Sequence, residues 1–280
     1  MKKITRRSFL AAAGLTAAAL ALTACGGSSS STASSTASSA AAASSEAASS
    51  SAAAELTTVE TGKLTMATNA TFPPYEMTTD TGAFEGIDVD TAQAIAEKLG
   101  LELQIDDMEF DAALLSVQQG KADIVMAGVT VTDERKAVMD FSDSYATGIQ
   151  SIIIPEGSDI ATPDDLAGKK IGTQRGTTGY IYCSDDFGDE NVVAYDSGLT
   201  AVQALNNGQV DAVVIDNAPA QEYVAANPGL VILDTSYAEE DYAIGMAKGS
   251  ALEDAINAAL EELKADGTLQ SIVDKYITAE

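Results

Sequence analysis

The chain has 280 residues and is strongly acidic, with 42 Asp and Glu against 15 Lys and Arg and a formal net charge of −27. Such a charge disfavours nucleic acid as a partner, because phosphate backbones are repelled. The sequence contains no histidine, which removes the usual general base and most zinc sites. It also has no phosphate-binding or dinucleotide-binding glycine motif. We therefore expect a binding protein without catalytic residues, cofactor or metal ion, although a hydrolase that uses carboxylates alone stays possible.

Residues 1–24 have the features of an export signal. A head with four basic residues precedes residues 9–24, which are uncharged, mostly apolar and too few for a comfortable membrane span. The head resembles a twin-arginine export signal, although ordinary secretory signals also carry arginine pairs. Leu-Thr-Ala-Cys at residues 22–25 resembles a bacterial lipobox. This predicts that Cys25 becomes the lipidated N-terminus of the mature protein; the alternative is an ordinary signal with a chance cysteine.

Residues 25–58 are expected to form a lipidated cysteine followed by a flexible tether. The segment is composed almost wholly of Ser, Ala and Thr up to residue 54, so it cannot bury a core. About 30 such residues have a root-mean-square reach of roughly 30 Å. We therefore expect an exported globule held by lipid at the outer face of the cytoplasmic membrane. Beyond Cys25 the only cysteine is Cys183, which we interpret as a small buried hydrophobe.

From residue 59 onward, short apolar runs alternate with amphipathic segments, which is typical of the α/β class with parallel sheets. The expected strands cover residues 63–68, 101–105, 124–127, 152–154 and 170–173. The expected helices cover residues 91–99, a segment from 110 onward, and residues 132–136, 162–166, 250–264 and 269–276.

One unit occurs twice, at residues 113–128 and 201–216. Each copy reads as a helix, a Gly stop, an Asp three residues later and a short apolar strand, with Gly120 and Gly208 suited to the left-handed position after a helix. The repeat predicts two similar lobes. In open α/β sheets, ligands bind beyond the carboxyl ends of strands. Four segments qualify by this rule: residues 69–72, 128–135, 174–178 and Asp216.

Motifs occur at residues 86–96, 127–135, 140–142 and 176–179, together with Asp216. In this order they closely resemble the motifs of the bacterial extracellular solute-binding proteins, family 3, which are polar amino acid receptors of ABC importers. Thr91 departs from the pattern, since an aliphatic residue is usual there, but the change affects only a helix face. The resemblance covers residues 59–280 in order.

The resemblance implies a two-lobed periplasmic-binding-protein-like α/β fold of type II, with a mostly parallel sheet and flanking helices in each lobe. It places lobe I at residues 59–148 plus 243–280 and lobe II at residues 149–242. Two hinge strands are expected near residues 147–151 and 241–245. The implied function is to bind a free amino acid by closing this hinge and to deliver it, as a monomer, to an ABC permease.

The resemblance also implies roles for the backbone-recognising part of the site. Arg135 would hold the ligand α-carboxylate, which agrees with the bidentate fit of a guanidinium to a carboxylate. Thr178 would add a contact from the second lobe, Thr130 would offer its hydroxyl and amide, and Gly128 its carbonyl. Asp216 would bind the α-ammonium, although it is also well placed to cap the following helix.

The ligand side chain is expected to meet two amides and two aromatic rings, from Asn69, Phe72, Phe110 and Gln174. The aromatic rings can sandwich a side chain, or they can belong to the core. Because both amides are neutral, they favour a polar uncharged amino acid, unless Glu76, Asp80 or Arg175 reaches inward.

Two other functions stay open from the sequence. An exported enzyme on the same fold, such as a dehydratase of a cyclic acid, would need a proton donor, for which Asp216 or Glu76 is available. An amino acid-sensing or surface-interaction protein would use the same ligand site without transport.

Overall fold

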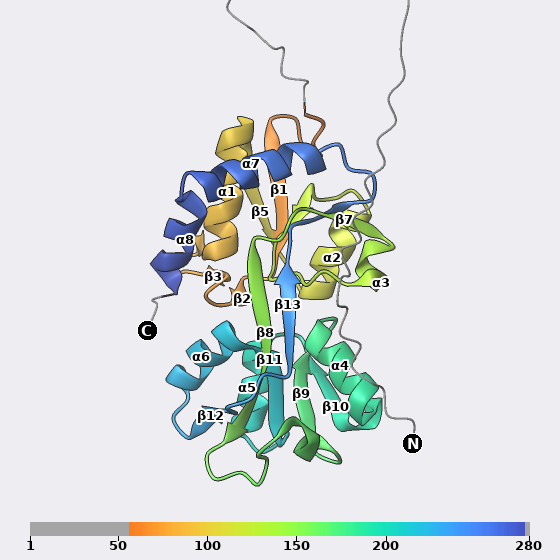
Figure 1. Cartoon of the computed structure of the whole chain (residues 1–280), viewed down its shortest axis with the longest axis vertical. Helices are drawn as coiled ribbons and strands as arrows, with labels where there is room; N and C mark the ends of the chain where they lie inside the picture. Colours follow the sequence, from red (N-terminus) through yellow and green to blue (C-terminus); the bar gives the residue numbers. More distant parts are fainter. Residues whose placement is uncertain (1–55, 278–280) are drawn as a thin grey trace, which may run out of the picture. The chain divides into compact units, whose positions relative to one another are not determined.

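The computed structural model describes residues 56–277, which fold into two lobes, each built on a sheet of its own (Figure 1). The predicted signal, the lipidated Cys25 and the tether up to residue 55 lie outside the described residues. Within residues 56–277, no helix is both long enough and apolar enough to span a membrane.

The first lobe contains a mixed five-stranded sheet in the order β5-β1-β6-β14-β7. β1 pairs in parallel with β5 and β6, whereas β14 pairs antiparallel with β6 and β7. The strands are β1 (Lys63–Thr68), β5 (Glu102–Asp107), β6 (Ile124–Val125), β7 (Met139–Phe141) and β14 (Gly245–Ala247).

Helices cover both faces of this sheet because alternate residues of its strands point to opposite sides. Leu64 and Met66 of β1 pack in one core cluster with residues of α1 and α7. Ala67 points to the opposite side of the sheet and packs in a second cluster with residues of α2. The helices are α1 (Ile87–Leu99), α2 (Phe110–Gln118), α3 (Asp133–Lys136), α7 (Glu253–Ala265) and α8 (Thr268–Tyr276). A small antiparallel sheet of β2 (Thr71–Phe72), β3 (Glu76–Thr78) and β4 (Phe84–Glu85) adjoins them.

The second lobe contains a six-stranded sheet in the order β10-β9-β11-β8-β12, with β13 also paired to β8. β9, β10 and β11 are parallel, and β8 pairs antiparallel with β11, β12 and β13. The strands are β8 (Ala146–Pro155), β9 (Ile171–Gln174), β10 (Val192–Tyr195), β11 (Ala212–Asp216), β12 (Leu230–Ile232) and β13 (Ala238–Tyr242). The helices are α4 (Thr178–Phe187), α5 (Gly198–Asn206) and α6 (Asn217–Ala226), with short 3-10 turns at Pro163–Leu166 and Asp189–Asn191. Cys183 is fully buried in α4, as expected.

Two connections join the two sheets along residues 56–277. One runs from β7 into β8, and the other from β13 into β14. β8 and β13 lie side by side, and Ala146 pairs with Tyr242 at one end of the ladder and Gln150 with Ala238 at the other (Figure 1). The first predicted hinge segment, residues 147–151, lies within β8, and the second, residues 241–245, runs from the end of β13 to the start of β14. The hinge and the lobe boundaries stay predictions.

The two-lobed α/β class is confirmed, with one correction to its detail. The sheets are mixed rather than mostly parallel, because β8, β12, β13 and β14 add antiparallel pairs to a parallel core of three strands in each lobe. The repeated unit appears as α2–β6 and α5–β11, and Gly120 and Gly208 take φ values of 65° and 66° after the two helices. α1 begins at Ile87, four residues earlier than predicted.

Candidate ligand-binding site

All nine residues that were predicted to contact a ligand line one cavity. They are Asn69, Phe72, Phe110, Gly128, Thr130, Arg135, Gln174, Thr178 and Asp216. The wall also includes Glu76, Ala127 and Thr177. Residues from both lobes therefore share this cavity.

The loop after β6 approaches the cavity at Gly128, which has a φ of 57°. A Cβ on Gly128 would lie 2.8 Å from Cε1 of Phe72, so only glycine fits this position without a shift of the ring. The Gly128 amide donates to Oδ2 of Asp88 at 3.0 Å, and the Tyr145 hydroxyl donates to Oδ1 of the same carboxylate at 2.7 Å. Burial raises the pKa of Asp88 to about 6. Asp88 thus positions the loop, a role that the sequence motif alone did not reveal.

Arg135 is a buried cation at the cavity wall. It sits in α3, whose first turn is capped by Thr132, which accepts from the Arg135 amide at 3.2 Å. Its guanidinium donates to the carbonyls of Thr130 at 2.7 Å and of Gly176, in the second lobe, at 3.1 Å, and lies 5.4 Å from the centre of the Phe110 ring. Burial lowers the pKa of Arg135, but a guanidinium stays charged in proteins. None of the ion pairs within residues 56–277 involves Arg135.

Asp216 is a buried acid at the carboxyl end of β11, from the second lobe. It occupies the N-cap position of α6, but its side chain makes no capping hydrogen bond there. The carboxylate instead accepts from the Tyr242 hydroxyl and, at 2.9 Å, from Nε2 of Gln150. Burial is the main reason why the pKa of Asp216 rises to about 7, and the charge of Glu240 acts in the same direction.

Glu240 of β13 is a second buried carboxylate beside Asp216. Its Oε2 accepts from the hydroxyls of Thr178 at 2.9 Å and Thr130 at 3.1 Å, and from Nε2 of Gln150 at 3.0 Å. Sequence analysis did not single out Glu240, because it lies in an acidic run that is typical of a solvated surface. The structure shows that Glu240 occupies the buried position between two exposed neighbours on β13.

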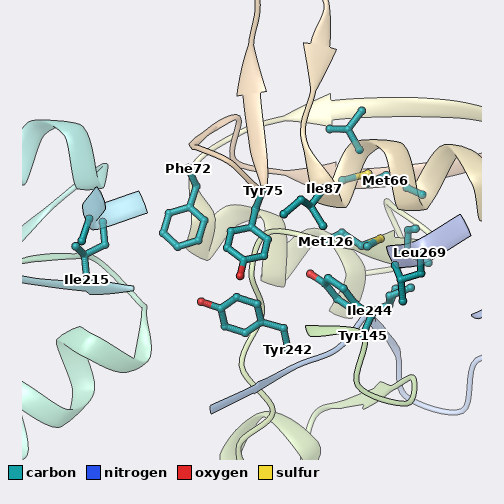
Figure 2. Packing of buried hydrophobic residues seen from close by; sticks show 14 of the residues in the cluster. Met66, Phe72, Tyr75, Ile87, Met126, Tyr145, Ile215, Tyr242, Ile244 and Leu269 are labelled. Atoms are coloured by element: carbon teal, nitrogen blue, oxygen red, sulfur yellow. The ribbon is translucent and has the colours of Figure 1, made fainter. Parts of the chain in front are cut away.

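Aromatic rings and amides form the rest of the wall. Phe72 stacks on Tyr75 with ring centres 5.8 Å apart, and Tyr75 meets Tyr242 edge-on at 5.3 Å, so the ring of Phe72 is fixed by a buried aromatic cluster (Figure 2). Phe72 therefore both packs in the core and lines the cavity. Nε2 of Gln174 donates to Oδ1 of Asn69 at 2.8 Å, which links the amides of the two lobes.

Of the three charged residues that were considered for the side-chain pocket, the structure brings only Glu76 into it. Glu76 is fully buried, and neither of its carboxylate oxygens has a hydrogen-bond partner within the described part of the chain. Its burial, and next the charge of Asp88, raise its pKa well above the usual value. Asp80 and Arg175 are exposed and do not line the cavity, so neither reaches inward.

Residues 64–279 match the model of the bacterial extracellular solute-binding proteins, family 3. The chain belongs to this family. As predicted from its motifs, this family 3 protein is a solute-binding protein and not an enzyme, so the dehydratase alternative is set aside.

Similar proteins are known both as sequences and as structures. The chain is 33% identical to the L-cystine-binding protein TcyJ of Escherichia coli (strain K12), over 79% of this chain and 85% of that protein. It is also 33% identical to the arginine-binding extracellular protein ArtP of Bacillus subtilis (strain 168), over 78% and 87% of the two chains. Among solved structures, an ancestral arginine-binding protein bound to arginine shares 43% identity, with a TM-score of 0.73 over 77% of this chain and 98% of the other. The arginine-, lysine-, histidine-binding protein ArtJ of Geobacillus stearothermophilus shares 34% identity, with a TM-score of 0.75 over 78% and 96%.

Proposed function

We propose that this family 3 protein is the exported, lipid-anchored receptor of an ABC importer and that it binds a free polar L-amino acid between its two lobes. The observation that carries the proposal is the pairing of opposite charges across one cavity. Arg135 of the first lobe and Asp216 of the second lobe both line it, and both are nine-tenths buried. An α-amino acid carries the matching carboxylate and ammonium.

The α-carboxylate and the α-ammonium of the ligand are bound by different lobes. The guanidinium of Arg135 binds the α-carboxylate, with hydrogen bonds about twice as strong as neutral ones, and Thr130 and Thr178 contribute further polar contacts. Asp216 binds the α-ammonium, assisted by the carbonyl of Gly128. Since one ligand must touch both lobes, binding favours the closed arrangement, and the segments at residues 147–151 and 241–245 act as the hinge. The closed form then docks on a membrane permease.

We further propose that the side chain of the ligand is rich in N–H donors, with L-arginine the first candidate. Glu76 supports this, because a buried carboxylate without a partner calls for a donor or a cation. Phe72 and Phe110 provide ring faces on which a planar cation can stack. The names of several relatives point the same way, since ArtP, ArtJ and an ancestral protein are named as arginine-binding, whereas TcyJ is named for L-cystine. L-Glutamine, which an ancestral arginine-binding protein also binds, is the uncharged alternative that the amides Asn69 and Gln174 favour.

A thermal-shift screen with the twenty L-amino acids, cystine and ornithine tests the proposal. A ligand present at 100 times its Kd adds about 2.7 kcal/mol to the free energy of unfolding, and we expect this from at least one amino acid. Arg135→Ala and Asp216→Ala are expected to abolish the shift. Lys136→Ala, at the exposed position next to Arg135 in α3, is the matched control and keeps it. A screen in which no α-amino acid stabilises the wild type contradicts the proposal.

A further inference from the structure

Glu240 makes a contact that the proposed binding mode leaves unexplained. The side chain is 7% exposed and lies on β13, one of the two strands that run between the lobes. Next to it, Tyr242 forms a bridge with Thr130, which brings the loop after β6 alongside the strand. One carboxylate oxygen of Glu240 therefore reaches Thr130 in the first lobe and Thr178 in the second, at 3.1 and 2.9 Å.

These two hydroxyls are the ones that the proposed function gives to the carboxylate of the ligand. A threonine hydroxyl has a single proton, so while it donates to Glu240 it cannot donate to another acceptor. The charge of Glu240 also acts on Arg135, where it opposes the lowering of the pKa by burial. Glu240 thus interacts with the same hydroxyls, and with the same guanidinium charge, that an α-carboxylate needs.

We propose that Glu240 is an affinity- and specificity-determining residue. Its carboxylate accepts the hydrogen bonds from Thr130 and Thr178 that the α-carboxylate of the ligand would otherwise accept. The inference rests on the proposed function, because it requires an amino acid that binds through Thr130, Thr178 and Arg135. An incoming carboxylate must take the two hydroxyl protons from Glu240 and must tolerate a second negative charge nearby. Glu240 therefore weakens carboxylate binding and links the two lobes through its own hydrogen bonds.

A different role for Glu240 makes the opposite prediction. Gln150 donates from the same nitrogen to Glu240 and to Asp216, at 3.0 and 2.9 Å, so the two carboxylates are neighbours. If Glu240 helped Asp216 to bind the α-ammonium, removal of its charge would weaken binding. The direction of the change in Kd therefore separates the two roles.

The test is isothermal titration calorimetry of wild type, Glu240→Gln and Glu239→Gln with L-arginine and L-glutamine and with their α-amides. Glu239→Gln is the matched control, because Glu239 is an exposed neighbour on the same strand. We expect Glu240→Gln to lower the Kd for the amino acid about tenfold, which corresponds to about 1.4 kcal/mol. The Kd for the α-amide, which brings no carboxylate charge, should change less than about twofold.

Different results would contradict the inference and the proposed function. If the wild type binds an amino acid and Glu240→Gln has an unchanged or higher Kd, the inference fails and the proposed function stands. If the wild type binds no amino acid in the wider screen, both fail. Glu240→Ala, which removes the carboxylate without adding a donor, covers the case in which the glutamine variant does not fold, and its Kd must also fall.

Discussion

At the scale of single residues, the proposed role of Asp216 would link the binding of a ligand to pH. Burial raises its pKa to about 7, so the folded protein holds a proton on this carboxyl at pH values where an ordinary aspartate has lost it. Only the ionised form attracts an ammonium, so a bound amino acid lowers this pKa, and binding below pH 7 must release the proton.

We therefore predict that affinity falls as the pH is lowered. Below pH 7 the Kd should rise by up to about tenfold per pH unit, the limit for one released proton. Above pH 7 it should level off, because Asp216 is then already ionised. Calorimetry at pH 6 in two buffers of different ionisation enthalpy measures the protons released on binding, which should approach one. A Kd that is constant from pH 5 to pH 8, without proton release, contradicts the assigned role of Asp216.

The residues that line the cavity were easier to predict from the sequence than the residues that hydrogen-bond to them. Arg135 and Asp216 follow strands in motifs that are specific to the family, so their positions in the cavity could be predicted. Gln150 and Glu240 lie in crossing strands, where contacts depend on how β8 and β13 pair. Such long-range pairing is set by the tertiary fold, and no local pattern encodes it.

At the scale of elements, the helix–glycine–strand unit was predictable because both of its signals are local. The left-handed glycine ends the helix and the apolar run forms the buried strand. The antiparallel strands of each sheet were not predictable in this way. β14 lies near the C-terminal end of the chain and pairs with strands of the first sheet. Its three residues carry no sequence pattern that identifies the strands with which it pairs.

The unit also offers a matched pair of glycines. Gly120 and Gly128 both have positive φ values, but a Cβ on Gly120 meets nothing within 4 Å, whereas one on Gly128 collides with Phe72. Both alanine variants should lose about 1 kcal/mol of stability from backbone strain, measured by urea denaturation. Only Gly128→Ala should also weaken amino acid binding, by at least about tenfold, because it displaces a wall of the cavity. Equal affinities of the two variants would show that the loop after β6 does not shape the site.

At the scale of the whole molecule, two lobes of similar construction present unlike charges to one cavity. The scaffold is repeated, but the first copy leads into the Gly128–Arg135 loop and the second ends at Asp216. This difference is the reason why we propose a ligand with two opposite charges rather than a simple anion or cation. The predicted tether would allow such a receptor to reach a permease while Cys25 holds it at the membrane.

The central claim is that the two lobes read the two charged ends of a free amino acid. Calorimetric titration of the wild type with L-arginine, Nα-acetyl-L-arginine and agmatine tests it directly, because each derivative keeps the guanidinium side chain and loses one end. We predict measurable binding of L-arginine and a loss of at least about a hundredfold, or about 2.7 kcal/mol, for each derivative. If agmatine or the acetylated compound binds as tightly as L-arginine, the pairing of Arg135 and Asp216 with the two ends of the ligand is wrong.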